Sequence, residues 1–117
     1  MITYLPFDIK RAFYIFGSDK DVVRGQHANR KTEFVLINVA GNSKVKVKDG
    51  MGNEAIYCLN RPHTGVYLPT RVWKDMYDFS EDSVLLCLAS EHYDPQGYIR
   101  DYTEFTKEIQ DMENEEK

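Results

Sequence analysis

Short runs of aromatic and β-branched residues, separated by turn-forming residues, are the feature that most constrains the fold of this chain. Such runs are typical of β-strands, and many short strands at regular spacing are typical of an all-β sandwich or barrel. In the run 43–50, Lys alternates with Val, which predicts a strand with one buried face and one solvated face. We therefore expect eight strands, within 9–16, 22–29, 32–41, 43–50, 54–60, 64–69, 72–79 and 83–90.

The pattern becomes helical beyond the turn at residues 95–97, where apolar side chains recur at intervals of three and four residues. These recurring side chains are Tyr102, Phe105, Ile109 and Met112. Asp101 followed by Glu104 resembles a capping box at the start of a helix. We therefore expect a helix over about residues 101–113 and a frayed acidic tail over 114–117.

The length of 117 residues fits one domain. The strand pattern favours an all-β jelly roll of the cupin type, which is a double-stranded β-helix. We expect this single domain to occupy residues 1–117 and to carry the C-terminal helix.

The formal net charge of −4 is concentrated in residues 101–117, which hold seven acidic and two basic residues. The remaining body is nearly neutral and has no basic helix, so nucleic acid is not an expected partner. No window approaches the roughly 18 apolar residues of a membrane span, and the first residues lack the pattern of a secretory signal. We expect a cytoplasmic protein with no membrane partner, in which Cys58 and Cys87 are buried reduced thiols.

The densest polar group inside a predicted strand is Arg24-Gly25-Gln26-His27-Ala28-Asn29. Strand alternation places Val23, Gly25, His27 and Asn29 on one face. A glycine in mid-strand indicates a bulge or a close backbone approach, and a bulge can turn Arg24 toward the same cavity. Because small β-barrels bind ligands in their mouths, this strand is a candidate site. The alternative is an ordinary surface strand that carries a titrating histidine.

Metal-binding cupins use a His-x-His pair, a Glu a few residues later and a His on a later strand. The corresponding positions here are His27, Asn29 and Glu33, with Lys74 or Tyr77 in place of the last His. One imidazole and one carboxylate make a poor site for zinc or iron, so we expect no metal. Neither a nucleophile elbow nor a phosphate-binding glycine motif is present, which argues against nucleophilic catalysis and against a nucleotide cradle of those types.

Three segments together resemble one known family. RGQHANRKTEFVLINVAG, GVYLPTRVWKDMYDFSEDSVLLCLAS and YIRDYTEF are similar to the metal-free cupins that act as dTDP-4-keto-6-deoxyhexose 3,4-ketoisomerases, the WxcM-like sugar isomerase family. The resemblance runs from about Phe7 to Phe105. It implies a homodimeric jelly roll that binds a dTDP-linked sugar and moves its carbonyl from C4 to C3 by proton transfer, with no cofactor.

The resemblance also implies roles for individual residues. His27 matches the first histidine of the family's HxH pair and would serve as the acid/base residue, to which an imidazole is suited near neutrality. Tyr14 matches an aromatic position beside the sugar, and Arg24 matches an arginine suited to pyrophosphate or sugar oxygens. Asn29 stands where the family has its second histidine, and its amide can orient a hydroxyl or a water but cannot exchange a proton at neutral pH.

Two other functions compete with the isomerase. One is a non-catalytic module that binds a nucleotide sugar, in partnership with an acyltransferase or an aminotransferase of the same pathway. The other is a 3,5-epimerase, in which Tyr67 or Tyr77 would deliver a proton from the opposite face of the ring. We expect Glu33, Tyr67 and Tyr77, together with Arg24, to bind the substrate.

Overall fold

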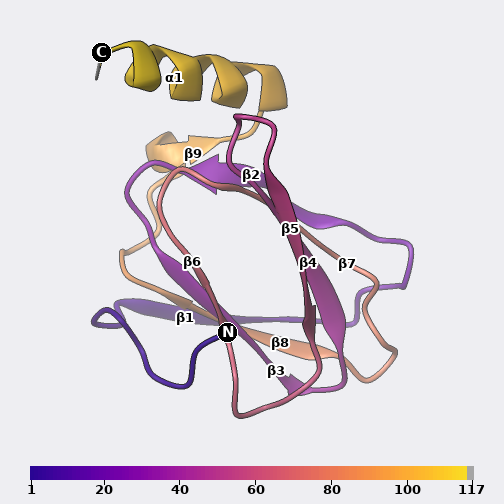
Figure 1. The fold of residues 1–117 in the computed structure, drawn as a ribbon. Coiled ribbons are helices and arrows are strands. Elements are labelled where there is room, and N and C mark those ends of the chain that lie inside the picture. The colour runs from indigo at the N-terminus through magenta and orange to yellow at the C-terminus, as the bar shows by residue number, and fades with distance from the viewer. Residues whose placement is uncertain (116–117) are drawn as a thin grey trace.

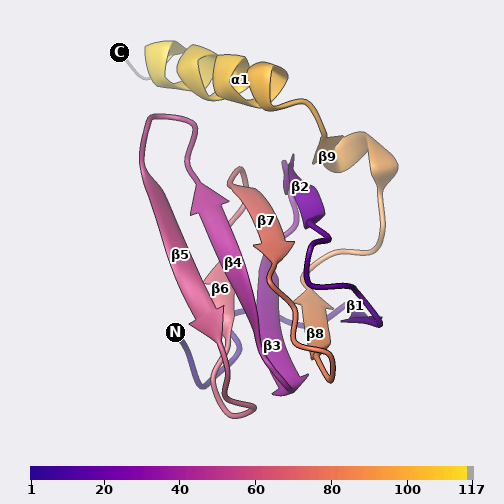
Figure 2. The same cartoon turned by 90° about the vertical axis from the view of Figure 1, so that its right-hand side faces the viewer.

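The computed structural model describes residues 1–115, and it consists of two antiparallel β-sheets with one helix at the C-terminal end (Figure 1). One sheet has the strand order β1 (Arg11–Phe16), β8 (Val84–Ala89), β3 (Phe34–Ala40) and β6 (Val66–Leu68). The other has the order β5 (Glu54–Leu59), β4 (Ser43–Lys48), β7 (Trp73–Tyr77), β2 (Arg24–Asn29) and β9 (Tyr98–Ile99). Figure 2 shows four strands of this second sheet, β5, β4, β7 and β2, side by side in front of the first.

The predicted fold class is confirmed, since each of the eight predicted runs contains a strand. The sequence analysis missed β9, which is only two residues long and forms because Tyr98 and Ile99 pair with the end of β2. A short 3₁₀ turn, Pro95–Gly97, precedes it. Cys87 is buried as expected, but Cys58 is exposed because it lies on β5, most of which is exposed; both are free thiols.

The core lies between the two sheets and is made by the inward-facing residues of both. The largest fully buried aliphatic side chains in it are Leu36, Leu59, Leu68, Leu85 and Val45. Val45 is buried whereas Lys44 and Lys46 beside it are partly exposed, so the predicted alternation of β4 is confirmed. This core fixes the spacing of the sheets around the cavity described below.

Helix α1 (Tyr102–Glu115) lies across one end of the five-stranded sheet (Figures 1 and 2). The Asp101 side chain accepts a hydrogen bond from the Glu104 backbone N–H at 3.1 Å, which caps the first turn. Phe105 is fully buried against Trp73 and Ile99, and this contact covers the outer face of β7 and β9. The described part of the chain has no helix with the length and apolar character that a membrane span requires.

The helix is longer than expected. It continues through Glu115 because no glycine or proline interrupts it, so residues 114 and 115 are helical rather than frayed. The rest of the predicted tail, 116–117, lies outside the described residues.

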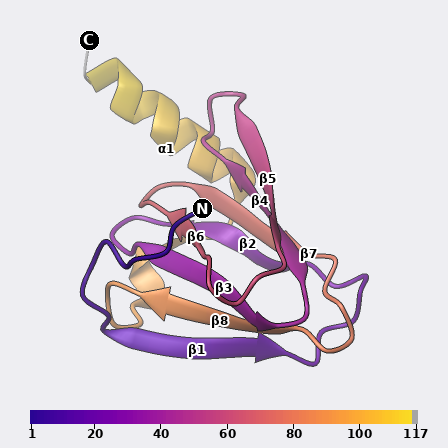
Figure 3. The same ribbon diagram turned by 60° about the horizontal axis from the view of Figure 1, so that its bottom comes forward.

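Strand β1 forms an outer edge of the four-stranded sheet, as Figure 3 shows beside β8. Within residues 1–115 it pairs only with β8. Its aromatic side chains Phe13, Tyr14 and Phe16 are exposed. This edge borders the cavity between the sheets.

Candidate active site

A cavity of about 410 Å³ lies between the two sheets. It is lined by residues of β1, β2, β3, β7 and β8 and by residues of the segment 93–100, and most of this lining is apolar or aromatic. Its charged and titratable side chains besides tyrosine and cysteine are Arg24, His27, Lys74 and Arg100. A largely apolar cavity with a few convergent polar groups is the usual form of a small-molecule site.

A β-bulge in β2 turns two of these polar side chains into the cavity. Arg24 and His27 both lie opposite inward-facing residues of β7, and the register shifts between them. Gly25 and Gln26 have φ angles of +83° and +52°, which supply the extra residue of the bulge. A Cβ on Gly25 would lie 2.9 Å from the carbonyl oxygen of Lys74, so the close approach of β7 also requires glycine. The expected bulge, and the turn of Arg24 toward the cavity, are confirmed.

The local contacts of His27 fix its tautomer. Its Nδ1 lies 2.9 Å from the carbonyl oxygen of Gly25. Because a carbonyl can only accept, Nδ1 carries the hydrogen and Nε2 carries the lone pair. The ring also packs against Tyr98, with centroids 4.7 Å apart and planes tilted by 33°. His27 therefore presents a base in a fixed orientation.

Burial, together with the positive charges of Lys74 and Arg100, lowers the pKa of His27 to about 4. Hydrogen bonding to Gly25 and Asn29 opposes this shift without cancelling it. The imidazole is consequently neutral at pH 7 and able to accept a proton.

Lys74 and Asn29 form a buried polar pair beside His27. Lys74 Nζ donates a hydrogen bond to Asn29 Oδ1 at 2.8 Å, and each residue is only 2% exposed. Lys74 Nζ also lies 4.8 Å from the centroid of the Phe34 ring. Among the described residues no carboxylate forms an ion pair with Lys74, and burial lowers its pKa to about 7.

The cavity is positively charged. Arg24, Lys74 and Arg100 line it, and within residues 1–115 no Asp or Glu does. The Arg11 guanidinium packs against the rings of Phe13 and Tyr93, which line the cavity. Its Nη2 donates a hydrogen bond to the Tyr98 hydroxyl at 3.3 Å, and its Nε is buried without a hydrogen-bond partner. Such a cavity favours an anionic ligand.

The structure brings together four of the seven predicted site residues. Arg24, His27 and Tyr14 line the cavity, although Tyr14 is 57% exposed, and Asn29 lies next to the cavity through its bond to Lys74. Sequence reasoning considered Lys74 only as a possible stand-in for a metal ligand and missed it as a site residue. The signal in the sequence was that strand alternation places Lys74 on the same face as the apolar Met76.

Glu33, Tyr67 and Tyr77 lie outside the cavity, so the geometry does not support their expected role in binding substrate there. Tyr67 lies between two buried residues of β6 and therefore points to the opposite face, where its hydroxyl donates to Glu33. That hydrogen bond and burial raise the pKa of Tyr67 to about 12. Tyr77 alternates with the inward-facing Met76, and its ring lies 6.0 Å from Lys46 Nζ.

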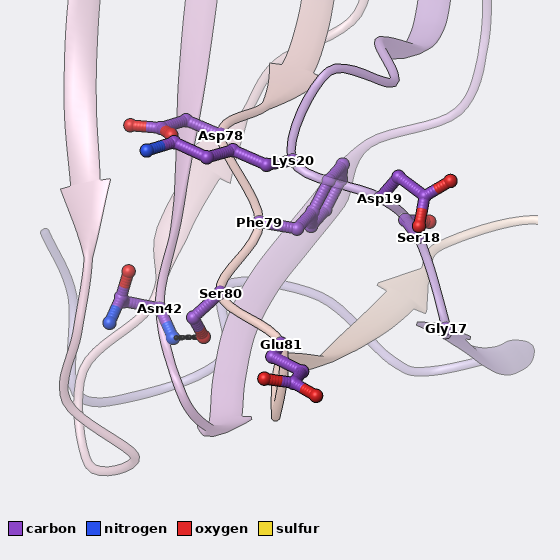
Figure 4. Close-up of a pocket in the computed structure, with 9 residues that line it drawn as sticks. All are labelled: Gly17, Ser18, Asp19, Lys20, Asn42, Asp78, Phe79, Ser80 and Glu81. Carbon is purple, nitrogen blue, oxygen red and sulfur yellow. Dashed lines mark hydrogen bonds between the residues drawn. The ribbon is translucent and has the colours of Figure 1, made fainter.

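A larger hollow of about 710 Å³ lies among the loops around residues 17–20 and 78–81 (Figure 4). Two of its polar groups are already engaged, since Asp78 pairs with Lys44 at 3.1 Å and Ser80 Oγ accepts from the Asn42 backbone N–H at 2.9 Å. Figure 4 shows the carboxylates of Asp19, Asp78 and Glu81 well apart from one another. The groups do not converge, so the cavity between the sheets is the better candidate for an active site.

Metal-ligand side chains do not gather anywhere in residues 1–115, where no group of three His, Cys, Asp or Glu is close enough to share an ion. His27 is the only histidine that lines the cavity, because His63 and His92 are exposed elsewhere on the surface. The cavity therefore offers a single imidazole, that of His27.

The chain is similar in sequence to proteins named as sugar 3,4-ketoisomerases. The family model described as FdtA, WxcM-like, C-terminal, matches residues 2–110. The TDP-4-oxo-6-deoxy-alpha-D-glucose-3,4-oxoisomerase of Aneurinibacillus thermoaerophilus is 43% identical over 105 residues, which cover 90% of this chain and 75% of that protein.

Solved structures share the fold as well. QdtA, a sugar 3,4-ketoisomerase from Thermoanaerobacterium thermosaccharolyticum solved with TDP, is 44% identical, with a TM-score of 0.88 over 92% of this chain and 78% of its own. WlaRA, a TDP-fucose-3,4-ketoisomerase from Campylobacter jejuni, is 39% identical, with a TM-score of 0.86 over 89% of this chain and 76% of its own. As the motifs of its strands had indicated, the chain belongs to the FdtA family of WxcM-like C-terminal domains.

Proposed function

We propose that this protein is a 3,4-ketoisomerase that moves the carbonyl of a dTDP-linked 4-keto-6-deoxyhexose from C4 to C3. The observation that carries the proposal is His27, a neutral imidazole with an unprotonated Nε2, in a cavity that is also lined by Arg24, Lys74 and Arg100. The relatives support the substrate class, since a His-to-Asn form of QdtA was solved in complex with TDP-4-keto-6-deoxyglucose.

The chemistry needs one base and a positive environment. His27 Nε2 removes the proton from C3, the electrons of the C3–H bond form a C3=C4 double bond, and the carbonyl electrons move onto the C4 oxygen. The cations of the cavity stabilise this enolate oxygen, which is the charge that develops in the transition state. The O3 proton then passes to O4, the C3 carbonyl forms, and C4 takes up a proton. The net change is one proton from C3 to C4 and one from O3 to O4.

The remaining polar residues fit the other parts of such a substrate. Arg24 and Arg100 carry planar guanidinium groups, which bind the diphosphate oxygens through paired hydrogen bonds. Tyr14, at the exposed part of the lining, offers an aromatic face beside the sugar or the base.

We propose a homodimer, because β1 is an edge strand with exposed aromatic side chains next to the cavity. Sedimentation at micromolar concentration should give a species of twice the 13.7 kDa chain mass. A protein that stays at 13.7 kDa would contradict the dimer. We further propose a cytoplasmic location and a partner enzyme of the same pathway, an aminotransferase acting on the 3-keto product or an acyltransferase acting later.

Incubation with dTDP-4-keto-6-deoxyglucose, followed by NMR, tests the function. A C3-keto product with the diphosphate intact supports the isomerase. Proton exchange at C5 with inversion would indicate a 3,5-epimerase instead. Saturable binding without turnover would indicate a nucleotide-sugar-binding module.

A further inference from the structure

Lys74 is buried on the central strand of the five-stranded sheet and faces the cavity. Burying an ammonium without a negative partner costs free energy, and packing alone would be satisfied by an aliphatic side chain. Polar groups kept in such positions are frequent at functional sites. The fold therefore gives no reason for a lysine at this position, and the reaction does.

We infer that Lys74 is the general acid that delivers the proton to C4, and that Asn29 positions its Nζ. The inference rests on the proposed ketoisomerase function and assigns the proton donor that the function leaves open. His27 removes the C3 proton, and Lys74 supplies a different one to the neighbouring carbon.

The sheet register places the base and the acid side by side. His27 and Lys74 are direct partners in the β2–β7 ladder, so their side chains project from adjacent positions on the same face. Both line the cavity. C3 and C4 of the sugar are bonded to each other, and two proton-transfer groups on neighbouring strands can reach one carbon each.

Asn29 explains how the lysine is held. Its Oδ1 accepts a hydrogen bond from one of the three N–H groups of the ammonium and leaves the other two N–H groups for substrate. An amide oxygen accepts at any pH and adds no charge, so it orients Lys74 Nζ while raising the affinity of the amine for its proton less than a carboxylate would. Asn29 thus holds the Lys74 ammonium in place and still allows it to release its proton near neutral pH.

The charges around Lys74 favour that release. His27 on β2 and Cys87 on β8 line the cavity with Lys74, as do the charged side chains of Arg24 and Arg100. Burial raises the pKa of the Cys87 thiol to about 12, so near pH 7 Cys87 is a neutral thiol that forms no ion pair with Lys74. Once His27 has taken the C3 proton it is an imidazolium, and repulsion between the two cations promotes transfer from Lys74 to C4. The imidazolium then loses its proton and the Lys74 amine regains one through solvent, which closes the cycle.

Lys74→Met, which keeps the volume and removes the amine, separates this inference from the function itself. In D₂O the wild-type protein should form the C3-keto sugar with deuterium at C4. Lys74→Met should lower product formation by at least ~100-fold, the usual contribution of a general acid, while exchange of the C3 proton of the substrate falls much less. Lys46→Met, a lysine on the outer face of the next strand, is the matched control and should behave as wild type.

Product from the wild type together with undiminished product from Lys74→Met would overturn the inference and leave the function standing. Substrate carrying deuterium at C3 gives a second test in H₂O. Deuterium recovered at C4 of the product would mean that His27 alone carries the proton, which also overturns the role of Lys74. No product and no C3 exchange from the wild type would instead refute the proposed function.

Discussion

The neighbouring strands β4 and β7 both carry lysines among apolar residues, but their lysines point to opposite faces of the sheet. On β4 the valines Val45 and Val47 face inward and the lysines face outward. In the β4–β7 ladder Val47 lies opposite Lys74. On the inner face of the sheet, β7 therefore has an amine beside a valine of β4. The comparison teaches that packing on this face would accept an aliphatic residue at position 74, and that the hydrogen bond to Asn29 is the contact specific to the lysine. This contrast is what the inferred catalytic role of Lys74 explains.

His27→Asn should produce the largest effect, because it removes the base that faces Lys74. The asparagine amide can still donate to the Gly25 carbonyl, so the bulge should persist while proton transfer is lost. We expect product formation to fall by ~10²–10⁴-fold with TDP binding nearly unchanged, measured by NMR and by calorimetry. His92→Asn, an exposed histidine outside the cavity, is the control. Full activity in His27→Asn would mean that another residue is the base.

Gly25→Ala should break the register that brings His27 opposite Lys74. The new Cβ would meet the Lys74 carbonyl at 2.9 Å in addition to the strain of a φ of +83°. We expect a loss of ~1–3 kcal/mol in the free energy of unfolding, measured with denaturant, and a loss of activity. Gly52→Ala controls for backbone strain alone, because Gly52 has a φ of +93° and open space around it. Equal losses in the two variants would show that the close approach of β7 does not matter.

Asn29→Asp should sharpen the comparison by giving the buried lysine the negative partner that it lacks. The carboxylate would stabilise the ammonium and raise the pKa of Lys74 by ~1–3 units. The upper limb of the pH profile of kcat/KM should therefore move to higher pH by that amount. If the upper limb stays in place in Asn29→Asp, it does not belong to Lys74.

The smallest effect concerns stability. Lys74 has a pKa of about 7 in the folded protein, against 10.5 when exposed, so above pH 7 the unfolded chain binds more protons and the folded state gains stability as pH rises. Between pH 7 and 8.5 the free energy of unfolding should rise by at most ~1.4 kcal/mol per pH unit. Lys74→Met should lose this slope and Lys46→Met should keep it. A slope that persists in Lys74→Met would place its origin elsewhere.

Much of the fold could be predicted from sequence, because the alternation of apolar and polar residues identifies each strand and the turn-forming residues mark its ends. The bulge in β2 was predictable from Gly25, and with it the positions of Arg24 and His27. Lys74 was not, because β7 is buried on both faces: Trp73 packs against Phe105 of α1 while Met76 faces the core. Alternation in such a strand does not show which face contains the cavity.

The other differences between the structure and the sequence analysis have a related cause. Three residues have side chains suited to bind a sugar but do not line the cavity: Glu33, Tyr67 and Tyr77. The two tyrosines lie at strand positions that face away from it, and Glu33 lies in a loop. Asn29 was expected to orient a hydroxyl or a water, and its oxygen instead accepts from Lys74 across the ladder. A contact between residues 45 positions apart depends on strand pairing, which no local pattern reveals.

The pH dependence of kcat/KM for the wild-type protein tests the pairing of a neutral base with a buried acid most directly. His27 must be unprotonated and Lys74 protonated in the free enzyme, so activity should fall below about pH 4 and above about pH 7, with both limbs set by burial. A profile that falls below pH 6.5, the ordinary pKa of histidine, and stays flat from pH 7 to 9 would contradict this account.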